Sequence, residues 1–140
     1  MSKKIVITGG LGYIGTELCK IYSGISWNNE ILVIDNRFVS ERVNQLRNWG
    51  IKFIHGDVLD RELIKSYLSN VDIVHHLAGI TQVSRTAKES NVKEDEKINQ
   101  VAIDGTQNVI SSIPNSCRII FPSTHVVFEG IQSTKKEILE

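Results

Sequence analysis

The 140-residue sequence matches one ordinary domain, long enough to bury a continuous hydrophobic core without disulfide support. Its 16 basic and 16 acidic residues cancel without a run of like charge, and no apolar run could cross a bilayer or form a signal-peptide core, so we expect neither nucleic-acid nor membrane binding. Cys19 and Cys117 lack the spacing of a metal or redox pair, which predicts packing thiols, no metal site and a cytoplasmic location.

The first elements are a strand, a helix and a second strand. Ile5–Ile7 and Ile31–Ile34 are short, β-branched and continuously apolar, which is typical of strands covered on both faces. Between them, apolar residues recur at helical spacing, and Gly24 is a suitable stop. These apolar residues are Ile14, Leu18, Ile21 and Ile25. The pattern predicts one βαβ unit.

The following elements alternate in the same way. A helix over Ser40–Trp49 begins with a capping serine and ends at Gly50, and Asp60 opens a short helix. A longer helix is expected over about Val92–Ser112, and Pro114 prevents its continuation. Its apolar stripe comprises Ile98, Val101, Ala102, Gly105 and Val109. Val71–Leu77 and Arg118–Phe121 repeat the pattern of strands covered on both faces, and Ile51–Ile54 is a fifth, weaker strand. Strands that alternate with helices predict a mostly parallel, doubly wound α/β sheet.

Three glycines, Gly9, Gly12 and Gly15, stand where the first strand passes into the first helix. In a dinucleotide-binding turn the first glycine permits the tight bend, the second lets backbone approach a pyrophosphate, and the third lets the helix pack close to the strand. The helix N-terminus then offers free N–H groups to the anion. Thr16 and Glu17 follow, so the Lys-Ser/Thr ending of an ATP- or GTP-binding loop is missing.

Asp35 ends the second strand 20 residues after Gly15. A carboxylate at this place accepts hydrogen bonds from the adenosine ribose hydroxyls and repels a 2′-phosphate, which favours NAD as the cofactor. Arg37 nearby keeps NADP as the less favoured alternative. Without a ligand, the glycines would form a structural turn and Asp35 would cap a loop.

Taken together, these motifs resemble those of the extended short-chain dehydrogenase/reductase family, the NAD-dependent epimerases and dehydratases of nucleotide sugars. "TGGLGYIG" is similar to the family's glycine signature, "VIDN" to its ribose-binding turn, "HGDVLD" to its adenine-side segment and "DIVHHLAGI" to its fourth strand. The resemblance implies a Rossmann-type, three-layer αβα domain over residues 1–140. It also implies a cofactor-binding set of Gly9, Gly12, Tyr13, Ile14, Gly15, Asp35, Asn36, Asp57, Val58, Leu77, Ala78, Gly79 and Ser123.

Some residues of these segments have structural alternatives. By the resemblance Asp57 and Val58 would touch the adenine, but Asp57 could instead cap the following turn. His75 and His76 point to opposite faces of a strand, so they cannot form a paired metal site and are expected to be structural. Gly105 inside a helix predicts a close helix contact.

The segment "FPSTHVVFEG" resembles the family's fifth strand and its Ser-Ser/Thr-x-x-Val-Tyr-Gly continuation. Thr124 then matches the catalytic Ser/Thr, whose hydroxyl would hydrogen-bond the substrate oxygen at the carbon being oxidised. Ser123 would lie near the nicotinamide. His125 and Val126 stand where related sugar dehydratases carry an Asp-Glu pair, which leaves an epimerase or a reductase.

The sequence departs from the family in two places. Ala102 stands where an asparagine usually precedes the helix glycine, and Asn99 lies one turn earlier. None of Tyr13, Tyr22 and Tyr67 is followed four residues later by lysine, so the family's Tyr-x-x-x-Lys acid/base pair is missing. We therefore expect an incomplete NAD-binding domain, truncated after the fifth strand and inactive alone.

The expected function is that of the NAD-binding portion of a nucleotide-sugar epimerase or related oxidoreductase, which acts by transient hydride transfer at a sugar hydroxyl carbon. The complete enzyme would take a nucleotide-sugar substrate, and a homodimer is possible. One alternative is a non-catalytic NAD(P)-binding regulatory or interaction module. Another is a steroid-type or flavonoid-type reductase of the same fold.

Overall fold

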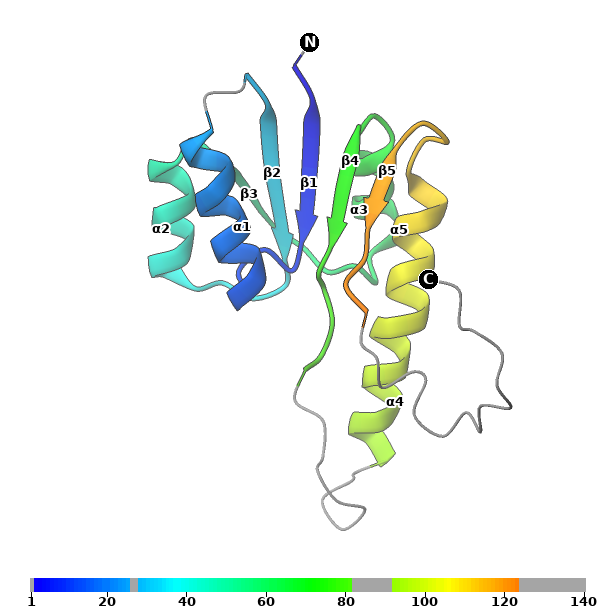
Figure 1. The fold of residues 1–140 in the computed structure, drawn as a ribbon. Coiled ribbons are helices and arrows are strands. Elements are labelled where there is room, and N and C mark those ends of the chain that lie inside the picture. The colour runs from blue at the N-terminus through cyan, green and yellow to red at the C-terminus, as the bar shows by residue number, and fades with distance from the viewer. Residues whose placement is uncertain (1, 26–27, 82–91, 124–140) are drawn as a thin grey trace, which may run out of the picture.

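The strands that the structure describes form one parallel sheet. The computed structural model describes residues 2–25, 28–81 and 92–123. The sheet has five strands in the order β3-β2-β1-β4-β5, and every neighbouring pair is parallel (Figure 1). The strands are β1 (Lys4–Thr8), β2 (Glu30–Asp35), β3 (Lys52–His55), β4 (Ile73–His76) and β5 (Arg118–Ile120). The parallel, doubly wound sheet expected from the sequence is confirmed.

Helices cover both faces of the sheet, which gives three layers. They are α1 (Tyr13–Gly24), α2 (Ser40–Asn48), α3 (Arg61–Leu68), α4 (Val92–Gln100), the π-helical turn η1 (Val101–Gly105) and α5 (Thr106–Ser112). The α1 and α2 helices lie on one face, and α3 lies on the other with α4, η1 and α5 (Figure 1). Side chains of β1 alternate between two buried clusters, since Ile7 packs with Cys19 of α1 and Val6 packs with Val109 of α5. Of the described helices, none is long and apolar enough to cross a membrane.

The helix boundaries follow local signals, although both ends of α2 differ from the prediction by one residue. Asp60 caps α3, where its Oδ1 accepts a hydrogen bond from the Leu63 N–H at 3.0 Å. Gly50 follows α2 with a φ of +70°, as expected of a helix stop. The expected serine cap of α2 is wrong, because Ser40 is already its first helical residue and Val39 holds the N-cap position.

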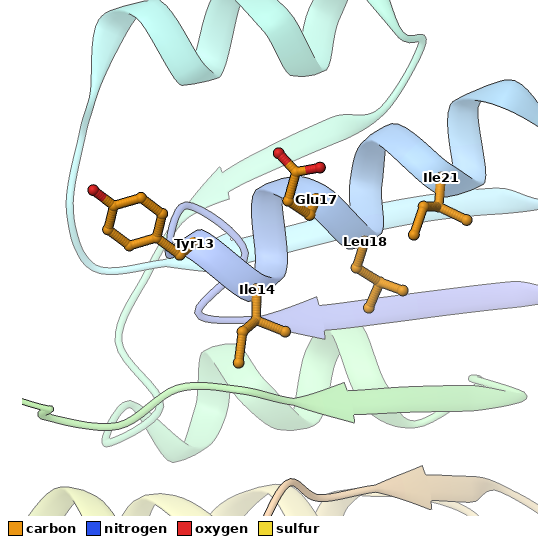
Figure 2. A pocket seen from close by; sticks show the side chains of 5 residues that line it. All are labelled: Tyr13, Ile14, Glu17, Leu18 and Ile21. Carbon is orange, nitrogen blue, oxygen red and sulfur yellow. The ribbon is translucent and has the colours of Figure 1, made fainter.

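The α1 helix approaches the sheet most closely through small residues, with Leu18 and Tyr22 partly buried beside them. Gly15 and Cys19 are buried, whereas Ile14 and Ile21 are 65% and 59% exposed. The approach is close, because a methyl group on Gly15 would lie 2.6 Å from the Gly10 Cα. Burial also raises the pKa of the Cys19 thiol to about 12, which fits a packing residue. Ile14 and Ile21 therefore face outwards, and they line a shallow hollow together with Tyr13, Glu17 and the partly buried Leu18 (Figure 2).

The long helix and the last strand also differ from expectation in detail. The helix is continuous over α4, η1 and α5, with a π-helical turn that the sequence did not indicate. Gly105 ends this turn, and a methyl group there would lie 2.7 Å from the Val58 Cγ2, so the close helix contact is confirmed. Ala102 is exposed and so lies off the buried stripe. Ile119 and Ile120 of β5 are 36% and 42% exposed, so the prediction of a strand covered on both faces is wrong there.

Candidate functional site

The candidate residues meet at the carboxyl ends of the strands. From β1 the chain moves outwards through β2 and β3, and it then returns to the other side of β1 to form β4 and β5. The sheet order reverses between β1 and β4, and open α/β sheets bind ligands in the crevice at such a point. The predicted residues from Gly9 to Gly79 follow the ends of β1, β2, β3 and β4 at this edge.

The glycine turn begins with a backbone conformation that favours glycine. Gly9 has a φ of +71°, and a methyl group on it would lie 2.7 Å from the Ala78 Cα and N atoms beyond β4. Its N–H donates to the Ile34 carbonyl at 2.8 Å, and its own carbonyl accepts from the Gly12 N–H at 3.1 Å. Gly9 therefore bends the chain and brings it against both neighbouring strands.

Gly12 stands at the open side of the turn, as the N-cap of α1. Outside its chain neighbours, a methyl group on Gly12 would meet the Gly9 oxygen at 3.2 Å and the Arg37 Nη2 at 3.8 Å, and no other described atom within 4 Å. The first N–H groups of a helix have no intrahelical partner and carry the positive end of its dipole. The space that a side chain would fill thus lies beside donors suited to a phosphate.

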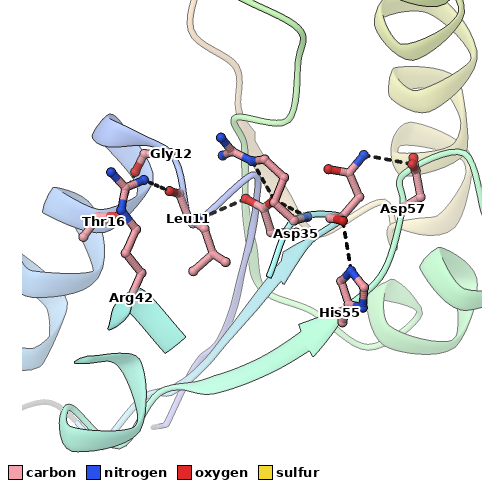
Figure 3. Close-up of polar contacts among 9 residues, drawn as sticks. Leu11, Gly12, Thr16, Asp35, Arg42, His55 and Asp57 are labelled. Atoms are coloured by element: carbon pink, nitrogen blue, oxygen red, sulfur yellow. Dashed lines mark hydrogen bonds and ion pairs between the residues drawn. The ribbon is translucent and has the colours of Figure 1, made fainter. Parts of the chain in front are cut away.

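Asp35 ties the glycine loop to β2. It is 4% exposed, and its Oδ2 accepts from the Leu11 N–H at 2.9 Å (Figure 3). Its Oδ1 accepts from the Arg37 N–H at 3.0 Å and from the Arg37 Nε at 3.3 Å. A carboxylate has about four acceptor positions, so these contacts leave capacity for a further donor such as a ribose hydroxyl. The sequence indicated the ribose role but gave no sign that Asp35 also holds Leu11.

Two arginines place positive charge around the same loop. The Arg42 Nη1 donates to the Leu11 carbonyl, and the Arg42 guanidinium carbon lies 5.5 Å from the centroid of the exposed Tyr13 ring. The Arg37 side chain is 58% exposed beside Asp35. Sequence reasoning noted Arg37 and missed Arg42, whose position depends on how α2 packs.

The ends of β2 and β3 are joined by side-chain hydrogen bonds. The Asn36 Nδ2 donates to the Asp57 Oδ2 at 2.9 Å, and the His55 Nε2 lies 2.9 Å from the Asn36 carbonyl oxygen (Figure 3). The Asp57 Oδ1 accepts from the Leu59 N–H at 2.9 Å, so Asp57 does cap the following turn. Val58 is 5% exposed and belongs to the core beneath this edge.

The end of β4 lies against β1. The Leu77 N–H donates to the Thr8 carbonyl at 3.0 Å, and the Ala78 N–H donates to the Thr8 Oγ1 at 3.4 Å. Leu77 and Ala78 are half-buried, whereas Gly79 is exposed. Two small residues, Ala78 and Gly79, thus follow the end of β4, and Ala78 lies directly against the glycine turn.

The remaining residues that the sequence singled out follow β5, belong to β4 or lie outside the described residues. Ser123 is exposed and follows β5. Thr124, His125 and Val126 lie outside the described residues. His75 and His76 do face opposite sides of β4, because the His75 Nε2 lies 2.8 Å from the Tyr22 hydroxyl of α1 while His76 contacts the opposite layer. Within the described ranges, no three His, Cys, Asp or Glu side chains gather as metal ligands would.

Comparison with known proteins identifies the family. The model of the 3-beta hydroxysteroid dehydrogenase/isomerase family matches residues 6–139. Over 94% of its length the chain is 30% identical to CDP-paratose 2-epimerase of Salmonella typhi, and over 98% it is 30% identical to UDP-glucose 4-epimerase of Mycoplasma genitalium. The chain belongs to the extended short-chain dehydrogenase/reductase family. This finding confirms the resemblance that the glycine, ribose and adenine segments carried.

Solved structures of this family share the fold. A UDP-glucose 4-epimerase from Stenotrophomonas maltophila, with bound NAD and formylated UDP-arabinopyranose, matches 96% of the chain with a TM-score of 0.69 and 20% identity. One from Bifidobacterium longum, in complex with NAD+ and UDP, matches 90% with a TM-score of 0.71 and 24% identity. The chain spans 40% and 38% of those two structures and 40% of each of the two epimerase relatives.

Proposed function

We propose that residues 1–140 form the NAD-binding portion of a nucleotide-sugar epimerase or related oxidoreductase of the cytoplasm. One observation carries the proposal: the open glycine turn between β1 and α1 lies beside a buried carboxylate at the end of β2, at the edge where the sheet order reverses and where open α/β sheets bind ligands. The epimerase relatives support the nucleotide-sugar class. The homodimer stays a prediction.

Each part of the crevice would hold one part of the dinucleotide. Gly12 and the first turn of α1 would receive the pyrophosphate, with Tyr13, Ile14 and Gly15 forming that turn. Asp35 and Asn36 would hydrogen-bond to the hydroxyls of the adenosine ribose. The remaining groups in the proposal are Asp57 and Val58 at the adenine, Leu77, Ala78 and Gly79 along the cofactor, and Ser123 at the nicotinamide end. When bound, NAD would supply a hydride acceptor, and Thr124 would orient the substrate hydroxyl.

Cofactor choice gives the direct test of this proposal. We expect NAD to bind at least about tenfold more tightly than NADP, because Asp35 would repel a 2′-phosphate. Isothermal titration of the purified chain measures both affinities. Asp35→Asn keeps the side-chain volume and removes the charge, so it should narrow the difference. Arg47→Gln, a charge change of equal size on the far turn of α2, is the matched control and should leave the ratio unchanged.

Equal affinities for NAD and NADP in the unaltered chain would contradict the assignment of Asp35. A chain that binds neither dinucleotide would contradict the proposal as a whole.

We also expect the 140-residue polypeptide to bind NAD without turning over any nucleotide sugar. A positioned general base contributes about 10²- to 10⁴-fold to a proton transfer, and the hydroxyl of Thr124 is too weak an acid to take that role unaided. No NADH absorbance should therefore develop with UDP-sugars or dTDP-sugars. Robust turnover by this polypeptide would refute the expectation, whereas NAD binding without turnover is also what a non-catalytic module would show.

A second candidate is a reductase of hydroxysteroid type, which the matching family model favours. The two candidates differ in the substrate of the complete enzyme. A protein that contains this chain together with a Tyr-x-x-x-Lys segment should be assayed against nucleotide sugars and 3-hydroxysteroids. Activity with steroids alone would decide for the second candidate.

A further inference from the structure

A buried histidine connects three elements beneath the crevice. His76 ends β4 and is 1% exposed. Its Nδ1 lies 2.7 Å from the Thr8 Oγ1 at the end of β1, and its Nε2 lies 3.0 Å from the Thr106 Oγ1 at the start of α5. The Phe121 ring covers it, with ring centroids 5.6 Å apart. One imidazole thus joins two strands and a helix.

The hydrogen bonds around His76 can form a series in which each residue donates to the next, from Ala78 to Thr106. The Ala78 N–H donates to the Thr8 Oγ1. The Thr8 hydroxyl can then donate to the Nδ1 of His76, which leaves the proton of a neutral imidazole on Nε2 to donate to Thr106. Burial lowers the pKa of His76, which favours this neutral form.

The first residue of this hydrogen-bonded series, Ala78, lies against the glycine turn of the candidate site. Ala78 is the residue whose backbone atoms would lie 2.7 Å from a methyl group on Gly9. The position of Ala78 therefore sets the width between the glycine turn and the end of β4. The Thr8 hydroxyl is its side-chain acceptor from β1, and at 3.4 Å that bond depends on how the hydroxyl is oriented.

We propose that His76 is a positioning residue for the dinucleotide, because it orients the Thr8 hydroxyl that holds Ala78 beside the glycine turn. This inference rests on the proposed NAD site. The affinity for the cofactor should then depend on the bond between His76 and Thr8. The bond between His76 and Thr106 contributes to the stability of the fold alone.

Two amide variants separate the two bonds. The side-chain amide of His76→Asn lies where Nδ1 stands and can keep the bond to Thr8 while losing Thr106. The amide of His76→Gln extends to the place of Nε2 and can keep Thr106 while losing Thr8. We expect His76→Asn to bind NAD within about threefold of the unaltered chain and His76→Gln to bind at least about tenfold more weakly, by isothermal titration. Thermal unfolding should show that both variants fold and that their melting temperatures are lowered by similar amounts.

Thr8 provides the complementary variants. Thr8→Val removes the hydroxyl and should weaken NAD binding as much as His76→Gln, and the double variant should lose no more than either one. Thr8→Ser keeps the hydroxyl and should bind NAD as tightly as the unaltered chain. Equal affinities of His76→Asn and His76→Gln at equal stability would overturn the inference, and so would additive losses in the double variant.

Amide exchange without cofactor separates this inference from the proposed function. The Ala78 N–H should exchange faster with solvent in Thr8→Val and His76→Gln than in His76→Asn or Thr8→Ser, as measured by nuclear magnetic resonance. An unaltered Ala78 exchange rate in the first two variants would overturn the inference. If the unaltered chain binds no NAD while the exchange pattern holds, the proposed function is wrong and the hydrogen-bonded arrangement is supported.

Discussion

Gly12→Val should lower NAD affinity by at least about a hundredfold, or about 2.7 kcal/mol, and leave the fold intact. Gly12 has a φ of −73°, which valine adopts without strain. A methyl group there would meet the Gly9 oxygen at 3.2 Å, which asks for a small adjustment, and the rest of the side chain would occupy the space beside Arg37 where the pyrophosphate is proposed to lie. Isothermal titration gives the affinity, and circular dichroism reports the fold.

Gly24→Val is the matched control at the other end of α1. Gly24 is exposed, and outside its own helix a methyl group there would meet no described atom within 4 Å. The same chemical change should leave NAD affinity within about twofold of the unaltered chain. Retained binding in a folded Gly12→Val variant would show that the turn is structural and that the phosphates do not approach it.

The strands of the sheet could be predicted because their signal is local. A parallel strand covered by helices on both faces needs apolar residues at every position, and this requirement leaves continuous runs such as Ile31–Ile34. The Asp60 cap and the Gly50 stop are likewise set by residues next to the helix ends. The continuous apolar run of β5 predicted a strand correctly. Whether its two faces are covered depends on which elements pack against them, and Ile119 and Ile120 are partly exposed.

The packing of α1 shows what periodicity leaves open. Ile14 and Leu18 have the same spacing as Gly15 and Cys19, one residue and about 100° around the helix away. The spacing therefore predicts a helix but not which stripe faces the sheet. The small stripe is buried because Gly15 lets the helix approach Gly10, and no larger side chain fits there. The third glycine of the motif, whose role the sequence did indicate, thus decides the orientation of the helix.

Contacts between distant positions account for the rest of the site. The bond from Leu11 to Asp35 spans 24 positions, and the bond from Thr8 to His76 spans 68. Neither pair forms a pattern along the chain, since the partners meet only when the strands are in register. The sequence placed Asp35 at a ribose and His76 within a strand, but their roles in holding the loop and the end of β4 required the packed structure.

Gly9→Ala should destabilise the protein by about 3 kcal/mol or more and abolish NAD binding with it. Part of this cost is conformational, because a φ of +71° is unfavourable by about 1–2 kcal/mol for a residue that has a side chain. The larger part is the contact, because the methyl group would lie 2.7 Å from backbone atoms of Ala78, and Gly9 and Ala78 closely follow the paired ends of β1 and β4, which limits how far either can shift.

Gly50→Ala separates these two costs. Gly50 has nearly the same φ, +70°, and a methyl group there would meet no described atom within 4 Å outside its chain neighbours. It should therefore lose about 1–2 kcal/mol, and the excess loss of Gly9→Ala measures the close approach of β1 and β4. Urea denaturation gives both free energies of unfolding. Equal losses in the two variants would mean that Ala78 yields freely to the methyl group, in which case the two strand ends do not hold each other and the crevice between them has no fixed width for a dinucleotide.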